Sequence, residues 1–180
     1  MKQYILETER LLIRPFQLGD EDGVLEFSST PQVVEYTGDI VRSSLEEAKD
    51  LIENVWLKDY ATFGYGRFAV IYKPDDKLIG FCGFKFISEV GMTDLGYRFL
   101  PEYWGKGIAT ESSIKMLEFG FSVLKLSKVF GTVYPQNPAS SVVLRKLGFT
   151  LKGLKPYPGE DHRDMEWYYL TKEEYDANKE

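Results

Sequence analysis

The sequence predicts one α/β domain over residues 1–180, built on a mixed, mostly antiparallel sheet of about six to seven strands flanked by helices. Two observations lead to this prediction. Most of the apolar, β-like runs are joined by segments short enough for hairpins, which pair strands antiparallel. One step differs, from "TDLGYRFL" at 93–100 to "SKVFGTVY" at 127–134, because it contains a whole predicted helix. Such a βαβ crossover predicts that these two strands are parallel.

The first third of the chain predicts one strand and two helices. "RLLIRPF" at 10–16 is apolar and β-like, and Pro15 ends it because proline cannot donate to a strand ladder. Asp20 stands at the N-cap position of a short helix. A stronger helix follows Ser44, which has capping-box spacing to Glu47 and precedes apolar residues at helical period.

The rest of the chain alternates strands and helices. Three consecutive strands are expected from the apolar runs at 66–73, 77–87 and 93–100, and the first two are separated by a Pro-Asp turn. A helix over about 105–124 and the strand at 127–134 follow. The elements after them are a helix that starts at Asn137, two strands at 150–157 and 165–171, and a short helix or frayed tail.

The helix after Asn137 has the clearest boundaries. Asn137 is a favoured N-cap residue, Pro138 suits the first helical position, and Gly148 follows the helix end. We therefore expect this helix to be short and well defined.

Charge and composition exclude several classes of function. The net charge is −6, from 22 basic and 28 acidic residues, so nucleic acid and anionic membranes are poor partners. The single Cys82 and the single His162 allow neither an internal disulfide nor a zinc cluster. The start of the chain has no signal-peptide hydrophobic region, and no apolar stretch reaches the roughly 18 residues of a membrane span. We expect a cytoplasmic protein that binds no metal.

"PEYWGKGIATES" at 101–112 predicts an anion site. A helix that begins near Gly105 has unpaired N–H groups and a positive dipole at its start, and two glycines remove the Cβ atoms that would block an anion. Lys106 adds a charge. A tight turn without a ligand is the alternative. The Walker-type loop is absent, and the dinucleotide fingerprint is incomplete because Thr110 stands where a third small residue belongs, which leaves a dinucleotide-binding protein as a weaker hypothesis.

Four stretches together resemble the GNAT acetyltransferase superfamily, in particular the branch of ribosomal-protein N-terminal acetyltransferases. They are "ETERLLIRPFQLGD", "KLIGFCGF", "DLGYRFLPEYWGKGIATE" and "NPASSVVLRKLGF", in the order and spacing of the family. The resemblance covers nearly the whole chain. Glu102 departs from the family pattern, which has Gln or Arg at the first position of the loop.

The resemblance implies where acetyl-CoA binds. The loop is expected to hold the pyrophosphate through backbone groups, and the preceding strand is expected to bear a β-bulge, diverge from its parallel neighbour and bind the pantetheine. Asn137 resembles the family asparagine that contacts this co-substrate, besides its role as an N-cap. The implied binding residues are Phe99, Leu100, Gly105, Lys106, Gly107, Ile108, Ala109, Thr110 and Asn137.

The resemblance also implies acid and base candidates. Where many members of the superfamily have a tyrosine as the acid, this chain has Leu144; Ser140 matches the serine that takes the role in the N-terminal acetyltransferase branch, and is otherwise a capping residue. Asp94 is a candidate base that would act through water, and is otherwise a solvated carboxylate. Glu160 is a second candidate base, although solvation is the favoured interpretation of its loop, as it is for His162.

The expected reaction is therefore acetyl transfer to a primary amine by direct attack in a ternary complex. The acceptor is either a peptide or protein N-terminus or a small amine, and the protein is either a monomer or a homodimer. A non-catalytic acyl-CoA-binding module is the alternative function, because the family tyrosine is missing.

Overall fold

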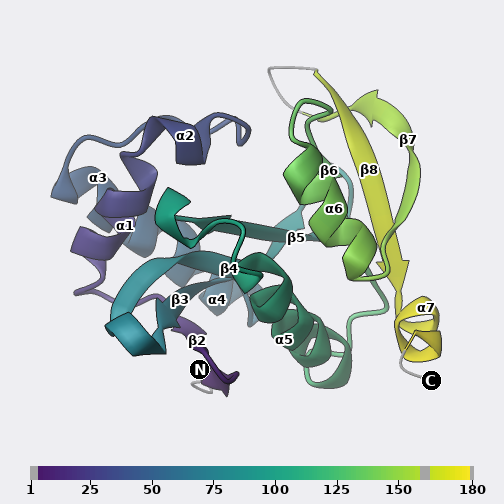
Figure 1. The fold of residues 1–180 in the computed structure, drawn as a ribbon, viewed down its shortest axis with the longest axis horizontal. Coiled ribbons are helices and arrows are strands. Elements are labelled where there is room, and N and C mark those ends of the chain that lie inside the picture. Colours follow the sequence, from purple (N-terminus) through teal and green to yellow (C-terminus); the bar gives the residue numbers. More distant parts are fainter. Residues whose placement is uncertain (1–3, 159–162, 179–180) are drawn as a thin grey trace.

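An eight-stranded sheet runs through the computed structural model, which describes residues 4–158 and 163–178 (Figure 1). The spatial order is β1-β2-β3-β4-β5-β6-β8-β7. Among the strands of the described residues, only β5 and β6 pair in parallel, which confirms the predicted crossover. The strand bounds are β1 Leu6–Glu7, β2 Leu11–Pro15, β3 Arg67–Tyr72, β4 Lys77–Ile87, β5 Met92–Phe99, β6 Lys128–Val133, β7 Thr150–Pro156 and β8 Asp164–Thr171.

The predicted number of strands was too low by one. β1 has 2 residues, which is too short for an alternating pattern to be read from the sequence. The other strands lie where apolar runs predicted them, and β2 ends at Pro15 as expected.

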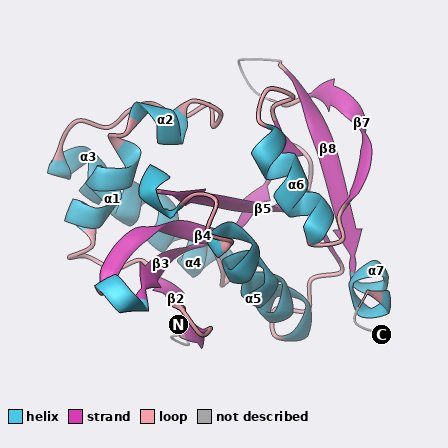
Figure 2. Ribbon diagram, viewed as in Figure 1, coloured by secondary structure: helices cyan, strands magenta, loops and turns pink. Residues whose placement is uncertain are grey.

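Helices lie on both faces of the central strands (Figure 2). Phe81 of β4 packs edge-on against Phe27 of α1, while the side chains of Cys82 and Phe84 on the other face meet α5. This two-sided cover explains the nearly continuous burial of β4. The helix bounds are α1 Glu21–Ser28, α2 Pro31–Val34, α3 Leu45–Leu51, a π-turn Ile52–Trp56, α4 Leu57–Phe63, 3₁₀ turns Lys73–Asp75 and Pro101–Tyr103, α5 Ile108–Ser122, α6 Pro138–Lys146 and α7 Lys172–Ala177.

The predicted caps are confirmed in part. Ser44 Oγ accepts a hydrogen bond from the Glu47 N–H at 3.2 Å, but the Glu47 carboxylate accepts from the N–H of Ser43 rather than that of Ser44. Asp20 precedes α1 without capping it, because its carboxylate pairs with Arg14 at 2.7 Å. For α1 the predicted cap residue, Asp20, therefore stands at the right position, but its side chain does not cap the helix.

β5 and β6 diverge after a single bridge between Asp94 and Phe130. The expected bulge in β5 is not seen, because the β4–β5 register runs without a shift from Gly80–Phe99 to Ile87–Met92. Beyond this bridge no further pairing of β5 with β6 is seen in the described strands, and the two ribbons run apart (Figure 1). The splayed crossover is thus present without the bulge.

Candidate active site

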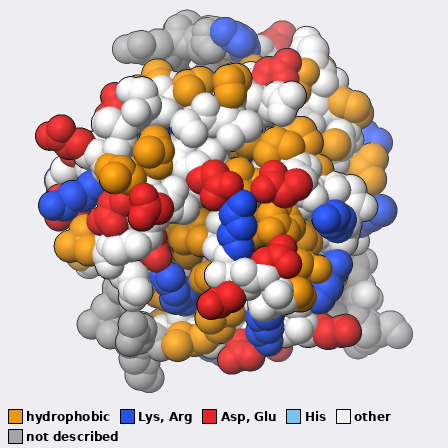
Figure 3. Space-filling view, turned by 60° about the vertical axis from the view of Figure 1, so that its left-hand side comes forward, with side chains coloured by type: hydrophobic (Ala, Val, Ile, Leu, Met, Phe, Trp, Pro, Cys, Tyr) orange, Lys and Arg blue, Asp and Glu red, His pale blue; other side chains and the backbone are white. Residues whose placement is uncertain are grey.

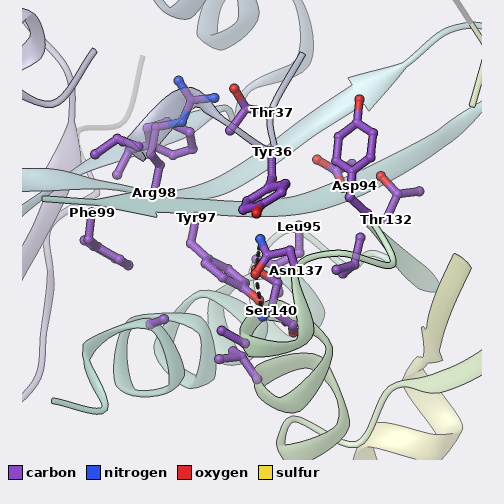
Figure 4. A pocket seen from close by; sticks show the side chains of 18 of the residues that line it. Tyr36, Thr37, Asp94, Leu95, Tyr97, Arg98, Phe99, Thr132, Asn137 and Ser140 are labelled. Carbon is purple, nitrogen blue, oxygen red and sulfur yellow. Dashed lines mark hydrogen bonds between the residues drawn. The ribbon is translucent and has the colours of Figure 1, made fainter. Parts of the chain in front are cut away.

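A cleft of about 1490 Å³ opens where β5 and β6 separate. One wall is formed by the start of α5 and another by α6, and the segment around α2 covers the opposite end. Side chains from both faces of β5 reach it (Figure 4). A cavity of this size exceeds what packing alone leaves in a protein interior and is large enough for an extended ligand.

The backbone of β5 supplies unused hydrogen-bonding groups to this cleft. The Leu100 N–H donates to the Ile79 carbonyl at 2.9 Å, which fixes which residues of β5 pair with β4. Because pairing alternates along an antiparallel ladder, the N–H and C=O groups of Tyr97 and Phe99 point to the other edge, towards the gap. The Phe99 carbonyl accepts from Trp104 Nε1 at 2.7 Å, and Tyr97 offers both of its backbone groups to a ligand.

The glycine loop ends at the cleft in the conformation that an anion site needs. Gly105 and Gly107 have φ of +71° and +79°, a left-handed backbone that strains other residues, and a Cβ at Gly105 would meet nothing within 4 Å. α5 begins at Ile108 instead of near Gly105. Ile108, Ala109 and Thr110 line the cleft with both glycines, so the first N–H groups of a 15-residue helix face it.

An ion pair between Arg10 and Glu111 fixes the glycine loop. Arg10 donates from Nε to Glu111 at 2.8 Å and from Nη2 to the Lys106 carbonyl at 3.0 Å. Thr8 Oγ1 donates to the same carboxylate at 2.6 Å. Burial raises the pKa of Glu111, but the bonds from Thr8 and Arg10 outweigh it and the pKa is lowered. The carboxylate therefore stays charged and tethers the loop to the strand edge.

Two expected binding residues lie outside the cleft. Leu100 is buried and its N–H is taken by Ile79, and the Lys106 ammonium lies over the Tyr103 ring at 5.4 Å. Glu102, the departure from the family pattern, pairs with Lys77 at 3.4 Å in an exposed contact. The Lys77 ammonium thus gives this acidic side chain a partner of opposite charge on β4.

Asn137 and Ser140 lie together at the start of α6, as predicted. The Ser140 N–H donates to Asn137 Oδ1 at 3.3 Å, and Asn137 Nδ2 donates to Ser140 Oγ at 3.1 Å. The Tyr97 hydroxyl donates to the Ser140 carbonyl at 3.2 Å (Figure 4). Burial raises the pKa of Tyr97 strongly, so this phenol stays protonated. Ser140 Oγ thus accepts one bond and keeps its own proton for a further acceptor.

Asp94 lies on the other face of β5 and is paired with Arg67. The guanidinium also donates from Nη1 to the Gly83 carbonyl at 2.6 Å. A Cβ at Gly96 would come within 2.5 Å of the guanidinium carbon, so glycine is needed there for Arg67 to lie flat across β5. Both side chains line the cleft, which places a carboxylate at its far side from Ser140.

Several cleft residues were not anticipated from the sequence. Arg67 and Arg98 were not among the expected site residues, and only the strand pairing brings them into one cleft. Tyr36 and Trp56 also line the cleft, although Trp56 is 4% exposed and mainly packs in the core. Glu160 and His162 lie outside the described residues.

The described part of the chain has neither a cluster of metal-binding side chains nor a helix that could span a membrane. Over residues 4–158 and 163–178, no group of three His, Cys, Asp or Glu side chains is arranged to hold a metal ion. In that same part of the chain, each helix is too short or too polar to cross a bilayer.

The cleft, the left-handed glycine loop and the splayed parallel pair define an acyl-CoA-dependent transferase fold. The family model described as acetyltransferase (GNAT) domain matches residues 10–150, and the chain therefore belongs to the GNAT acetyltransferase family. Its relatives are N-acetyltransferases, and it is itself an N-acetyltransferase that transfers an acetyl group to an amine.

Individual relatives agree over nearly the whole length. The uncharacterized N-acetyltransferase p20 of Bacillus licheniformis is 34% identical over 175 residues, 94% of this chain and 97% of that protein. The crystal structure of a GNAT-family acetyltransferase from Bacillus anthracis matches with a TM-score of 0.79 and 29% identity over 94% of this chain and 99% of that one. A ribosomal-protein-S5-alanine acetyltransferase from Vibrio fischeri shares the fold, with a TM-score of 0.79 and 20% identity over 96% of this chain and 98% of that one.

Proposed function

We propose that this acetyltransferase uses acetyl-CoA and acetylates a primary amine by direct attack within a ternary complex. The observation that carries the proposal is that the start of α5, the open edge of β5 and the Asn137–Ser140 pair all line one cleft. The first offers N–H groups to a pyrophosphate, the second offers backbone groups to pantetheine amides, and the third offers a proton. The pyrophosphate, the pantetheine and the thioester follow one another along acetyl-CoA, and each would meet one of these three groups.

Ser140 is proposed as the general acid. When the amine nitrogen bonds to the acetyl carbon and the carbon–sulfur bond breaks, the leaving thiolate needs a proton. Ser140 Oγ can donate it because Asn137 Nδ2 occupies an acceptor site of the oxygen and leaves its hydrogen available. The Tyr97 bond to the Ser140 carbonyl fixes the backbone of this turn. Leu144 fills the position of the tyrosine used elsewhere in the superfamily and is buried.

Asp94 is proposed as the base, acting through water on the other side of β5. The amine must lose one proton for each acetyl group transferred, and a carboxylate across the strand from the acid keeps the two proton transfers apart. Arg67 holds that carboxylate in place. The proposed acceptor is a peptide or protein N-terminus or a small amine. The protein is proposed to be a monomer or a homodimer and to act in the cytoplasm.

The test is thiol release from acetyl-CoA against a panel of peptide N-termini and small amines. Release that depends on an amine, together with an N-acetylated product of the expected mass, is the predicted result. Tight CoA binding without turnover of any amine would identify a non-catalytic acyl-CoA-binding module instead. Labelling of the protein by acetyl-CoA in the absence of amine would contradict direct attack, because it would reveal a covalent intermediate.

A further inference from the structure

Three arginines converge on the face of the sheet opposite Tyr97 and Phe99. Arg67 of β3 and Arg98 of β5 hold their guanidinium carbons over the Phe81 ring, at 5.6 and 5.2 Å from its centre. Arg42, from the segment before α3, lines the same end of the cleft. Figure 4 places Arg98 on the face of β5 that also bears Asp94. The chain as a whole has a net charge of −6, so this cluster is a local reversal of sign.

Carboxylates that line the cleft pair with two of these three arginines. Asp94 pairs with Arg67, and Asp39 pairs with Arg98 at 2.6 Å. Glu35, the other acidic residue among the described lining residues, interacts with the Tyr36 hydroxyl. Arg42 forms no ion pair with a described carboxylate that lines the cleft; its charge acts on Glu47, which lies outside the cleft. On the outer surface seen in Figure 3, by contrast, acidic and basic side chains are intermixed.

Two guanidinium groups also keep buried donors without acceptors. Arg98 Nε and Arg42 Nη1 make no hydrogen bond, although both atoms are buried. The Arg98 side chain is only 9% exposed. Burial lowers the pKa of Arg98, Asp39 opposes this, and the charges of Arg67 and Arg42 lower it further. Buried unpaired donors and crowded like charges both cost free energy, and an anionic ligand would remove both costs.

We propose that the acceptor is an amine that carries a carboxylate close to the reacting nitrogen, and that Arg98 and Arg42 bind this carboxylate. The inference rests on the proposed function, since it names the substrate class of that site. Guanidinium groups bind carboxylates through paired, charge-assisted hydrogen bonds. Arg98 and Asp94 lie on one face of β5, four residues and about 13 Å apart along the strand. The Arg98 guanidinium lies over the same Phe81 ring as that of Arg67, the partner of Asp94, so one small molecule or chain end can reach both. A polyamine would instead add positive charge beside this cluster of three arginines.

Matched pairs of acceptors test the inference. The first pair is a free amino acid and its amide. The second pair is a C-terminally amidated peptide that begins with Asp and the same peptide that begins with Asn. Spermidine is the polycationic acceptor. We expect the carboxylate member to have the higher kcat/KM, by roughly tenfold to a hundredfold, as for hydrogen bonds to charged groups. The ratio of kcat/KM for the acid to that for the amide is compared between the two pairs. The pair with the larger ratio shows whether the preferred carboxylate is that of a free amino acid or that of an acidic residue at a chain end.

Substitutions of the arginines test whether they cause the preference for the carboxylate acceptor over its amide. Arg98→Gln and Arg42→Gln should each bring the acid-to-amide ratio towards one, and Arg98→Lys should keep part of it. Lys152→Gln, which removes an exposed charge on β7 outside the cleft, should leave the ratio unchanged. An equal effect of Lys152→Gln would overturn the inference, because it would show that overall charge sets the ratio.

Failure of the inference and failure of the proposed function are distinguishable. Equal kcat/KM for acid and amide, or spermidine as the best acceptor, overturns the inference and leaves the acetyltransferase function intact. Absence of thiol release with every amine counts against the proposed function. Calorimetry of the same pairs with CoA-saturated protein then decides the inference by itself: tighter binding of the acid that is lost in Arg98→Gln supports it, and equal binding overturns it.

Discussion

Ser140 shows how a capping residue can also be poised for chemistry. Its backbone N–H satisfies the cap formed by Asn137, and its hydroxyl is oriented by the same side chain. Removing the hydroxyl leaves the backbone cap in place, so the two roles can be separated experimentally.

Ser140→Ala should lower kcat by roughly a hundredfold, the usual contribution of a general acid, with little change in KM for acetyl-CoA or in melting temperature. Steady-state kinetics and a thermal melt on the same preparation provide the measurement. Ser122→Ala, at the exposed end of α5 and outside the cleft, is the control. An unchanged kcat in Ser140→Ala would remove Ser140 as the acid.

Arg10 acts on the glycine loop through a backbone carbonyl. In Arg10→Ala the Lys106 carbonyl and the Glu111 carboxylate both lose a charged donor, so the loop is no longer held in its binding conformation. We expect KM for acetyl-CoA to rise by roughly tenfold or more, the equivalent of one hydrogen bond to a charged group, while kcat at saturation changes little. Arg10→Lys should recover part of the effect. A fall in kcat with constant KM would contradict a positioning role.

At the scale of single elements, α5 depends on its two preceding glycines. Gly107 occupies the N-cap position with φ of +79° and has only Arg10 Nη2, at 3.7 Å, near its missing Cβ. Gly107→Ala should therefore destabilise the protein by roughly 1 kcal/mol, through backbone strain and without a clash. Urea unfolding measures this cost. A loss of several kcal/mol would show that the residue packs against something that the structure does not place there.

The attachment of α6 to β8 depends on an ionised carboxylate. Glu166 accepts hydrogen bonds from the Tyr168 hydroxyl and from Ser141 Oγ, both at 2.7 Å, and these bonds lower its pKa below the ordinary 4.5. Because the folded-state pKa is lowered, the stabilisation is complete above pH 4.5 and is lost as the pH falls through the folded value.

Glu166→Gln should therefore be less stable than the parent protein at neutral pH, with the difference shrinking in acid. Denaturant unfolding at several pH values between 3 and 7 measures it, and Glu9→Gln is the control for an exposed carboxylate. A difference that is independent of pH would contradict the role of the charge.

For the whole molecule, ligand binding should appear as added stability. A ligand present at a hundred times its dissociation constant stabilises the folded state by about 2.7 kcal/mol. CoA and acetyl-CoA should therefore raise the melting temperature, whereas NAD should leave it unchanged. Protection by NAD and none by CoA would support the dinucleotide hypothesis that the glycine loop alone left open.

How far the sequence predicts this molecule differs between its parts. The strands, the parallel crossover and the cap of α6 follow from local signals: apolar periodicity, connection length, and an Asn-Pro pair before a helix. The expected bulge in β5 was wrong, because divergence of the two strands has no single-residue signature and can arise from twist. Leu100 and Lys106 belong to the motif but do not line the cleft: the Leu100 N–H donates to the Ile79 carbonyl, and the Lys106 carbonyl accepts from Arg10, contacts that no local pattern in the sequence indicates.

The sequence by itself determined the family, the order of the elements and the places of Asn137, Ser140 and the glycine loop, because each is a short-range pattern. Only the tertiary structure brought Arg42, Arg67 and Arg98, which are distant in the chain, to one end of the cleft and left two of their donors without acceptors. Pairing of β3, β4 and β5 decides the placement of Arg67 and Arg98, since register sets which side chains share a face. Arg42 is held by its backbone N–H, which donates to the Ser28 carbonyl at 3.1 Å. The nature of the acceptor is therefore a property of the folded sheet.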